Sequence, residues 1–140
     1  MENWWGNIWR RIAGWINDKG TQKVKLTRGT KDGSTAADYN TTGSGYKTIS
    51  GATPAGTFGG YISKCKTEPF GRFPNEASGS ATTFECDAMW FNNNQVNYAC
   101  VGGGWYGDLP VGPFCVYLAH APSVTSSDIG AALSCKPLAA

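Results

Sequence analysis

Glycine is the feature of this sequence that most restricts how the chain can fold. Nineteen of the 140 residues are glycine, and they are spread along the chain among many Ser, Thr and Asn residues. Glycine weakens helix interiors and supplies the positive φ angles that tight turns need. The sequence therefore predicts a loop-rich domain with short strands rather than a helical bundle. Its length is that of one domain, so we expect residues 1–140 to form a single domain.

The N-terminal segment departs from this pattern. Its bulky apolar residues recur at spacings of one, three and four: Trp4, Trp5, Ile8, Trp9, Ile12, Trp15 and Ile16. That spacing predicts a short amphipathic helix with Asn3 as its N-cap and Gly20 at its end. We expect the tryptophan face of this helix to cover a sheet, because tryptophan buries a large apolar area. A helix that lies on a membrane surface is the alternative.

Beyond Gly20 the pattern changes to alternation and short apolar runs. Val24 and Leu26 alternate with lysines, so residues 22–27 read as a strand with one solvated face. Further short strands are predicted at residues 46–49, 61–66, 82–87, 89–93, 97–103, 112–118 and 130–136. The last three are nearly apolar throughout, which predicts central positions in a sheet. Long loops rich in turn residues connect the earlier strands.

The net charge is small, and the charged residues are unevenly distributed along the chain. The 12 Lys and Arg residues exceed the 10 Asp and Glu residues by a net charge of +2, which is too small to predict a nucleic-acid partner. Residues 96–135 contain no Lys, Arg or Glu. Within that window every residue except Trp105 has a codon ending in cytosine, the set that mutation of adenines in AAC codons would generate. The low charge of buried strand segments is an alternative source of part of the same bias.

Cysteine and hydropathy patterns argue against a zinc site and a membrane span. The five cysteines show no CxxC or CxxH spacing. We expect most of them to be reduced, partly buried small apolar residues. A bridge between Cys86 and Cys135 stays open, because sequence does not decide it. No apolar run approaches the roughly 20 residues of a spanning helix, so membrane insertion is not expected.

Candidate catalytic groups are few. His120 is the only histidine and has no neighbouring carboxylate in sequence, so we expect a contact residue rather than a base. The glycines at 102–104 are not followed by a helix pattern, as a phosphate-binding loop requires. Asp87, Asp108 and Asp128 are too sparse for a calcium site. We therefore expect no catalytic residue, no metal and no cofactor.

Residues 103–128 have the composition of a binding surface. Trp, Tyr, His, Ser and Asp residues lie there on short strand and loop segments. Aromatic side chains provide a large contact area at low entropic cost, and small polar side chains adapt their hydrogen bonds to a partner. An ordinary solvent-facing loop is the alternative that composition leaves open.

Four segments together resemble the target proteins of bacteriophage diversity-generating retroelements. They are WWGNIWRRIAGWIND (4–18), WFNNNQVNYACVGG (90–103), GGGWYGD (102–108) and VGPFCVYLAHAPSVTSSDIGAALSCKP (111–137). The resemblance covers nearly the whole chain. It implies an α+β, C-type-lectin-like fold of the formylglycine-generating-enzyme (sulfatase-modifying-factor-like) type, with short, mostly antiparallel strands, the N-terminal amphipathic helix and long loops. The chain then corresponds to one such domain or to the C-terminal part of a longer one.

In that family a rigid scaffold displays hypervariable side chains, and the phage members are receptor-binding tail proteins. The resemblance implies a variable ligand-binding region at 96–135. Its contact positions would be Cys100, Gly104, Tyr106, Asp108, Pro113, Cys115, Tyr117, Ala119, His120, Val124, Ser126, Ser127 and Asp128. Its fixed scaffold positions would be Trp105, Gly107, Leu118, Ile129, Gly130, Ala131, Leu133 and Cys135.

We therefore expect a non-enzymatic binding protein, a host-attachment module of a phage tail. Its expected location is the virion or, alternatively, the bacterial cell surface. The partner would be a host cell-surface protein or glycan, and a homotrimer fits the analogy with tail proteins. Two alternatives remain: a structural tail or adhesin subunit with the tryptophan-rich segment as its oligomer interface, and a small carbohydrate-processing enzyme with a pair of carboxylates.

Overall fold

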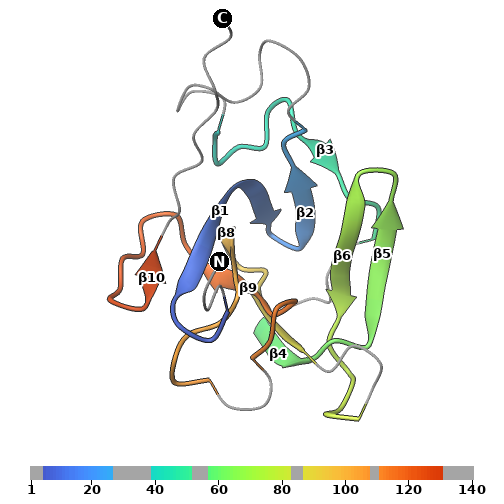
Figure 1. The fold of residues 1–140 in the computed structure, drawn as a ribbon. Coiled ribbons are helices and arrows are strands. Elements are labelled where there is room, and N and C mark those ends of the chain that lie inside the picture. Colours follow the sequence, from blue (N-terminus) through green and yellow to red (C-terminus); the bar gives the residue numbers. More distant parts are fainter. Residues whose placement is uncertain (1–4, 27–38, 52–56, 83–86, 108–110, 131–140) are drawn as a thin grey trace, which may run out of the picture.

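Strands make up the regular structure of the chain. A computed structural model describes residues 5–26, 39–51, 57–82, 87–107 and 111–130 (Figure 1). The strands in these ranges are β1 (Trp9–Asp18), β2 (Thr21–Val24), β3 (Lys47–Thr48), β4 (Thr57–Tyr61), β5 (Lys64–Glu68), β6 (Gly71–Glu76), β7 (Ala88–Asn92), β8 (Val96–Val101), β9 (Val116–His120) and β10 (Ile129–Gly130). The same ranges contain no helix.

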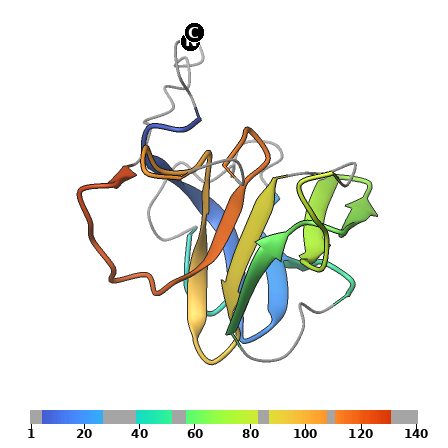
Figure 2. The same cartoon turned by 90° about the horizontal axis from the view of Figure 1, so that it is seen from below.

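Most of the strands belong to one sheet. Its order is β3-β2-β1-β8-β9-β7-β4, and β10 pairs with β1 beside this path. The pairs β7–β9 and β1–β10 are parallel, and the other pairs are antiparallel. Strands β5 and β6 form a separate antiparallel hairpin. Figures 1 and 2 show this hairpin on the opposite side of the molecule from the loop that joins β9 to β10.

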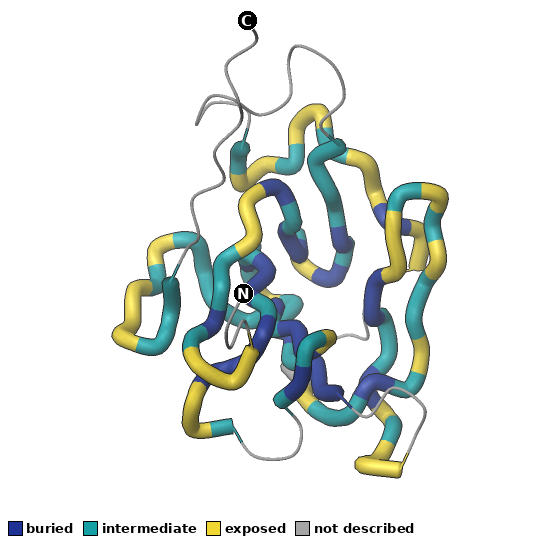
Figure 3. Tube along the Cα trace, viewed as in Figure 1, coloured by how far each residue is buried: buried dark blue, intermediate teal, exposed yellow. Residues whose placement is uncertain are grey.

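Side-chain alternation gives the central strands two different faces. One face, the core face, carries the largest buried cluster: Ile62, Ala77, Met89, Phe91, Ala99, Val116 and Leu118. Ile62 and Ala77 flank the β5–β6 hairpin in sequence, so the hairpin side of the molecule covers this face. The other face carries a second cluster in which Trp90 and Tyr117 pack against Trp9, Cys100 and Cys115. We call it the aromatic face. Figure 3 shows the buried residues along the central strands and exposed ones in the loop before β10.

The predicted N-terminal helix is wrong, and so are the α+β class and the C-type-lectin-like fold that included it. Residues Trp9–Asp18 form β1, which lies inside the sheet and pairs with β2, β8 and β10. Tryptophan and isoleucine favour strands, and pairing with three other strands outweighs the weak preference of a glycine-containing segment for helix.

Gly14 explains why β1 has a helix-like apolar spacing. Its φ of +82° and the shift in β1–β8 register between Arg11 and Ile16 mark an irregularity in the strand. Extra residues in a strand displace the alternation of side chains, so buried positions no longer recur at every second residue. Trp9 and Ile16 are both buried although they lie seven positions apart, an odd spacing that puts two residues on opposite faces of a regular strand. A spacing of seven is also two turns of a helix, so the pattern imitates helix periodicity.

Six of the predicted strands overlap observed ones. The predictions at 22–27, 46–49, 61–66, 89–93, 97–103 and 112–118 overlap β2, β3, β5, β7, β8 and β9. Strands β8 and β9 are central, as their apolar runs predicted. Residues 83–86 of the prediction at 82–87 and residues 131–136 of the prediction at 130–136 lie outside the described residues. Strand β6 was missed because Pro74 argues against a strand interior, but β6 belongs to a two-stranded hairpin, where a proline is tolerated.

Candidate binding surface

A row of residues crosses the aromatic face from β1 to β4. In the strand register Arg11 lies opposite Cys100, Cys100 opposite Tyr117, Tyr117 opposite Trp90, and Trp90 opposite Gly59. A side chain at Gly59 would place its Cβ 2.0 Å from Cδ1 of Trp90, so the indole ring lies over this glycine. Because Gly59 has no side chain, there is room at the end of the row for the indole ring of Trp90.

Aromatic rings fill the middle of this face. The ring centroid of Trp9 lies 5.9 Å from that of Trp90 and 5.3 Å from that of Tyr117, both in edge-on geometry. His120 stacks on Tyr117 with 4.3 Å between centroids. Such pairs contribute about 0.5–1.5 kcal/mol each beyond the burial of their area. Burial lowers the pKa of His120 and raises that of Tyr117, so both rings are neutral near pH 7.

A groove of about 460 Å³ opens beside these rings. It is lined by Trp9, Trp90, Gly104, Tyr106, Gly107, Val111 and Tyr117. A Cβ at Gly104 would lie 2.7 Å from Cε1 of Tyr106, and one at Gly107 would lie 2.1 Å from Cγ2 of Val111. Both glycines therefore permit close approaches that shape the groove. Its volume lies in the range of about 300–1,000 Å³ that small-molecule sites occupy.

A chain of hydrogen bonds runs from the groove to its polar edge. The indole Nε1 of Trp9 donates to Oη of Tyr106 over 3.1 Å, and that hydroxyl donates to Oδ2 of Asp128 over 2.6 Å. Ser126 Oγ donates to the other carboxylate oxygen. The hydrogen bonds from Ser126 and Tyr106 lower the pKa of Asp128, and the bond to Asp128 raises the pKa of Tyr106. The groove therefore has an ionised carboxylate and a protonated phenol at its edge.

The loop at residues 121–128, which we call the display loop, is anchored through its backbone. Arg11 Nη1 donates to the carbonyl of Pro122 over 3.0 Å, and Nη2 donates to that of Val124 over 2.6 Å. The backbone N–H of Trp9 donates to the carbonyl of Asp128 over 2.7 Å. The side chains at 123 and 125–127 are exposed. β1 thus fixes the path of this loop and leaves many of its side chains free for contact.

A second loop, at residues 111–115, depends on a buried carboxylate. Asp87 Oδ2 accepts a hydrogen bond of 2.7 Å from the backbone N–H of Phe114. A Cβ at Gly112 would lie 2.1 Å from Oδ1 of the same carboxylate. The Phe114 side chain is 76% exposed, and that of Trp105 on the neighbouring loop is 72% exposed. Exposed aromatic side chains of this size are typical of interaction surfaces.

Most of the predicted contact positions are accessible to solvent. Nine of them are exposed or half-buried: Tyr106, Pro113, Tyr117, Ala119, His120, Val124, Ser126, Ser127 and Asp128. Gly104 is buried but lines the groove. Asp108 lies outside the described residues.

The two predicted cysteine contacts lie beneath the surface. The side chains of Cys100 and Cys115 have no exposed area and pack against Trp9. Burial raises the pKa of the Cys100 thiol and raises that of Cys115 to about 12. In this conformation they support the aromatic rings and offer no atom to a partner.

Some of the predicted scaffold positions are buried and others are exposed. Leu118 is fully buried in the core, as a scaffold residue should be, whereas Trp105 is one of the most exposed large side chains. Ile129 and Gly130 form β10 and pair with Trp9 and Arg10. Ala131, Leu133 and Cys135 lie outside the described residues.

Sequence reasoning missed three residues that build the site: Trp9, Trp90 and Arg11. Trp9 and Arg11 were assigned to the wrong element, and their contacts with the C-terminal region are 97 to 113 residues distant in sequence. Trp90 carries a signal that could have found it. It stands between Met89 and Phe91 in a predicted strand, and alternation places it opposite them, on the face away from the core.

The described residues offer no metal centre and few reactive groups. No group of three or more His, Cys, Asp or Glu side chains in the described ranges is arranged to hold a metal ion. Cys65, Cys100 and Cys115 form no disulfide with one another. Cys86 and Cys135, for which a bridge stayed open, lie outside these ranges. No helix in the described part of the chain is long and apolar enough to cross a membrane.

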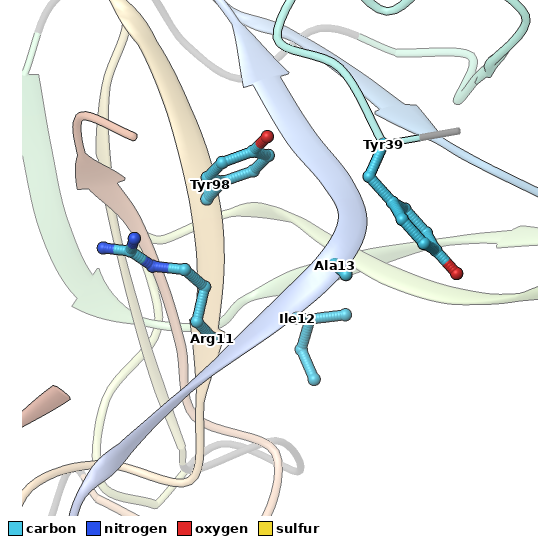
Figure 4. Close-up of a pocket in the computed structure, with 5 residues that line it drawn as sticks. All are labelled: Arg11, Ile12, Ala13, Tyr39 and Tyr98. Carbon is cyan, nitrogen blue, oxygen red and sulfur yellow. The ribbon is translucent and has the colours of Figure 1, made fainter. Parts of the chain in front are cut away.

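A smaller hollow of about 190 Å³ lies beside the irregular part of β1. Arg11, Ile12, Ala13, Tyr39 and Tyr98 line it. In the view of Figure 4, Arg11 and Tyr98 lie on one side of β1 and Tyr39 on the other. The Arg11 guanidinium lies over the Tyr98 ring, 5.9 Å from its centroid, which helps to orient the side chain toward the display loop.

Comparison with known proteins gives no relative: no family model matches the chain, and no curated protein or solved structure matches it.

Proposed function

We propose that this chain is a non-enzymatic binding protein, the host-attachment module of a phage tail, whose aromatic face and display loop contact a molecule on the host cell. The observation that carries the proposal is the division of the display loop into fixed backbone and free side chains. Arg11 and Trp9 hold the backbone at Pro122, Val124 and Asp128. Side chains can then change at exposed positions with little cost to the fold, as a diversified binding surface requires.

Exposed aromatic side chains next to the groove support the same function. Trp105, Tyr106 and Phe114 are 72%, 57% and 76% exposed. Tryptophan and tyrosine are the residues that most often dominate the binding energy of an interface. The absence of Lys, Arg and Glu from residues 96–135 leaves this surface with little charge to desolvate when a partner binds.

This function places the protein in the virion or, alternatively, on the bacterial cell surface, with a host surface protein or glycan as its partner. Several copies on one tail, as in a homotrimer, would raise the apparent affinity without new contacts.

Binding to intact cells tests the proposal. We expect the fluorescently labelled chain to bind some strains of a bacterial panel in flow cytometry. The triple substitution Tyr106→Ala, Tyr117→Ala and His120→Ala removes three aromatic rings and should abolish this binding. Phe70→Ala, in the β5–β6 turn, removes a half-buried ring on the opposite side and should leave it unchanged. Undiminished binding by a folded triple variant, or no binding to any strain, contradicts the proposal.

A further inference from the structure

We propose that the groove on the aromatic face binds a neutral saccharide ring. This inference rests on the proposed function and deepens it, because it names the chemical class of the receptor.

The lining of the groove suits the apolar side of a sugar ring. A pyranose ring presents a face of C–H groups, which packs on an aromatic face. Trp90 and Tyr117 are half-buried and line the groove, with 6.0 Å between their centroids and 31° between their planes. Two rings tilted by so little form one broad apolar wall. Gly104 and Gly107 also line the groove, and their lack of a side chain lets Tyr106 and Val111 pack closely there.

The polar edge of the groove suits sugar hydroxyl groups. The Asp128 carboxylate already accepts one hydrogen bond at each oxygen, from Tyr106 and Ser126. Each carboxylate oxygen can accept a second hydrogen bond, so two acceptor positions remain for ligand hydroxyls. Hydrogen bonds to a charged acceptor are stronger than those between neutral groups. A few well-placed polar groups in a mostly apolar groove are typical of small-ligand sites.

Charge argues for a neutral ligand. Residues 96–135 contain no Lys or Arg. The guanidinium of Arg11 uses both terminal nitrogens to hold the carbonyls of Pro122 and Val124. A sialylated, sulfated or phosphorylated sugar would therefore meet the Asp128 carboxylate without a cation to compensate for it.

The volume of the groove argues for a small ligand rather than a protein surface. A groove of about 460 Å³ has room for one or two sugar rings. A standard protein–protein interface buries about 800 Å² on each partner, which requires a wider contact than this groove provides.

An array of immobilised oligosaccharides tests the inference with the full chain. The array carries glucose, galactose, mannose and N-acetylglucosamine oligosaccharides, together with sialylated and sulfated counterparts. We expect binding to at least one neutral oligosaccharide and weaker binding to its anionic counterpart. Trp90→Ala and Asp128→Asn should each weaken that binding about tenfold or more, the range of interface hot spots. Phe70→Ala should not change it. Trp90→Phe retains a smaller ring and should give an intermediate affinity, provided that thermal unfolding shows a folded variant.

Binding of the chain to cells pretreated with periodate or with protease distinguishes this inference from the proposed function. Loss of binding after periodate but not after protease supports both. Binding that resists periodate and is lost after protease overturns the saccharide inference and leaves the proposed function standing. The inference is also overturned if no neutral oligosaccharide binds, or if Trp90→Ala and Asp128→Asn bind as the unmodified chain does. No binding to any cell contradicts the proposed function itself.

Discussion

Asp128 links the groove to the display loop. Its carboxylate accepts from Tyr106, which lines the groove, and from Ser126, which belongs to the loop. Its backbone carbonyl accepts from the N–H of Trp9 in β1. Three separate parts of the chain thus meet at one residue. Because the hydrogen bonds favour the ionised form, they lower the pKa of the carboxyl group.

This lowered pKa predicts an acid-dependent part of the stability. The folded-state pKa lies below the unfolded value of about 4, so the contribution is fully present above that value. It is lost as the pH falls through the folded-state pKa. The effect is small, because Asp128 is partly exposed to solvent. In urea unfolding at pH 6 and pH 3, Asp128→Asn should lose less stability on acidification than the unmodified chain. Asp18→Asn, at a surface ion pair far from the groove, serves as the comparison. Equal acid sensitivity of the unmodified chain and Asp128→Asn contradicts this role.

Part of the candidate surface consists of positions that the resemblance marked as contacts. Tyr106, Tyr117, His120 and Asp128 come from the expected contact positions, and the structure brings them to one side of the sheet. Their partners Trp9 and Arg11 could not be predicted in the same way. A hydrogen bond between residues 97 or more positions apart depends on sheet order, which local composition does not encode.

β1 shows how a strand can carry a helix-like pattern. Its buried positions include Trp9, Gly14, Ile16 and Asn17, a spacing that a regular strand does not give. The irregularity at Gly14, with its positive φ, changes which side chains face the core. The same glycine that weakens a helix is therefore a signal of an irregular strand, and the sequence contained that signal.

The substitution Gly14→Ala distinguishes a strand from a helix at β1, because its effect on the stability of the fold has opposite signs in the two structures. In a helix interior, the substitution would stabilise the chain by about 1 kcal/mol. At a φ of +82°, with the new Cβ 3.0 Å from Cβ of Lys25, it should instead destabilise by about 1–2 kcal/mol or more. Chemical unfolding followed by fluorescence measures the difference.

Gly6→Ala is the matched control for this substitution. Gly6 also has a positive φ, but its added Cβ would meet nothing within 4 Å, so only the backbone strain remains. We therefore expect Gly6→Ala to cost less than Gly14→Ala. A stabilising effect at Gly14 would contradict the strand.

On the scale of the whole molecule, the sheet separates the main core cluster from the candidate binding surface. Its core face packs Met89, Phe91 and Leu118 against the hairpin side of the molecule. Its aromatic face carries the groove, and the loops from the C-terminal region surround that groove. The display loop and the β5–β6 hairpin lie on opposite sides of the molecule (Figures 1 and 2).

Local patterns predicted many strands of this sheet but not its class. The apolar runs of β8 and β9 indicated central strands, and both are central. The position of β1 between β2 and β8 was not predictable from local pattern, because it joins segments from the two ends of the sequence. The tryptophan-rich segment was assigned to a helix from its local spacing, and the α+β class that the resemblance implied included that helix, whereas the described residues contain none.

Hydroxyl-radical footprinting of the cell-bound chain tests the central claim, that the aromatic face and display loop form the binding surface. Mass spectrometry then compares oxidation of each side chain in the free and bound states. We predict lower oxidation of Trp90, Tyr106 and Tyr117 in the bound state and unchanged oxidation of Phe70 and Phe73 in the hairpin. Protection confined to the hairpin, with no change at the three aromatic residues, would contradict the account.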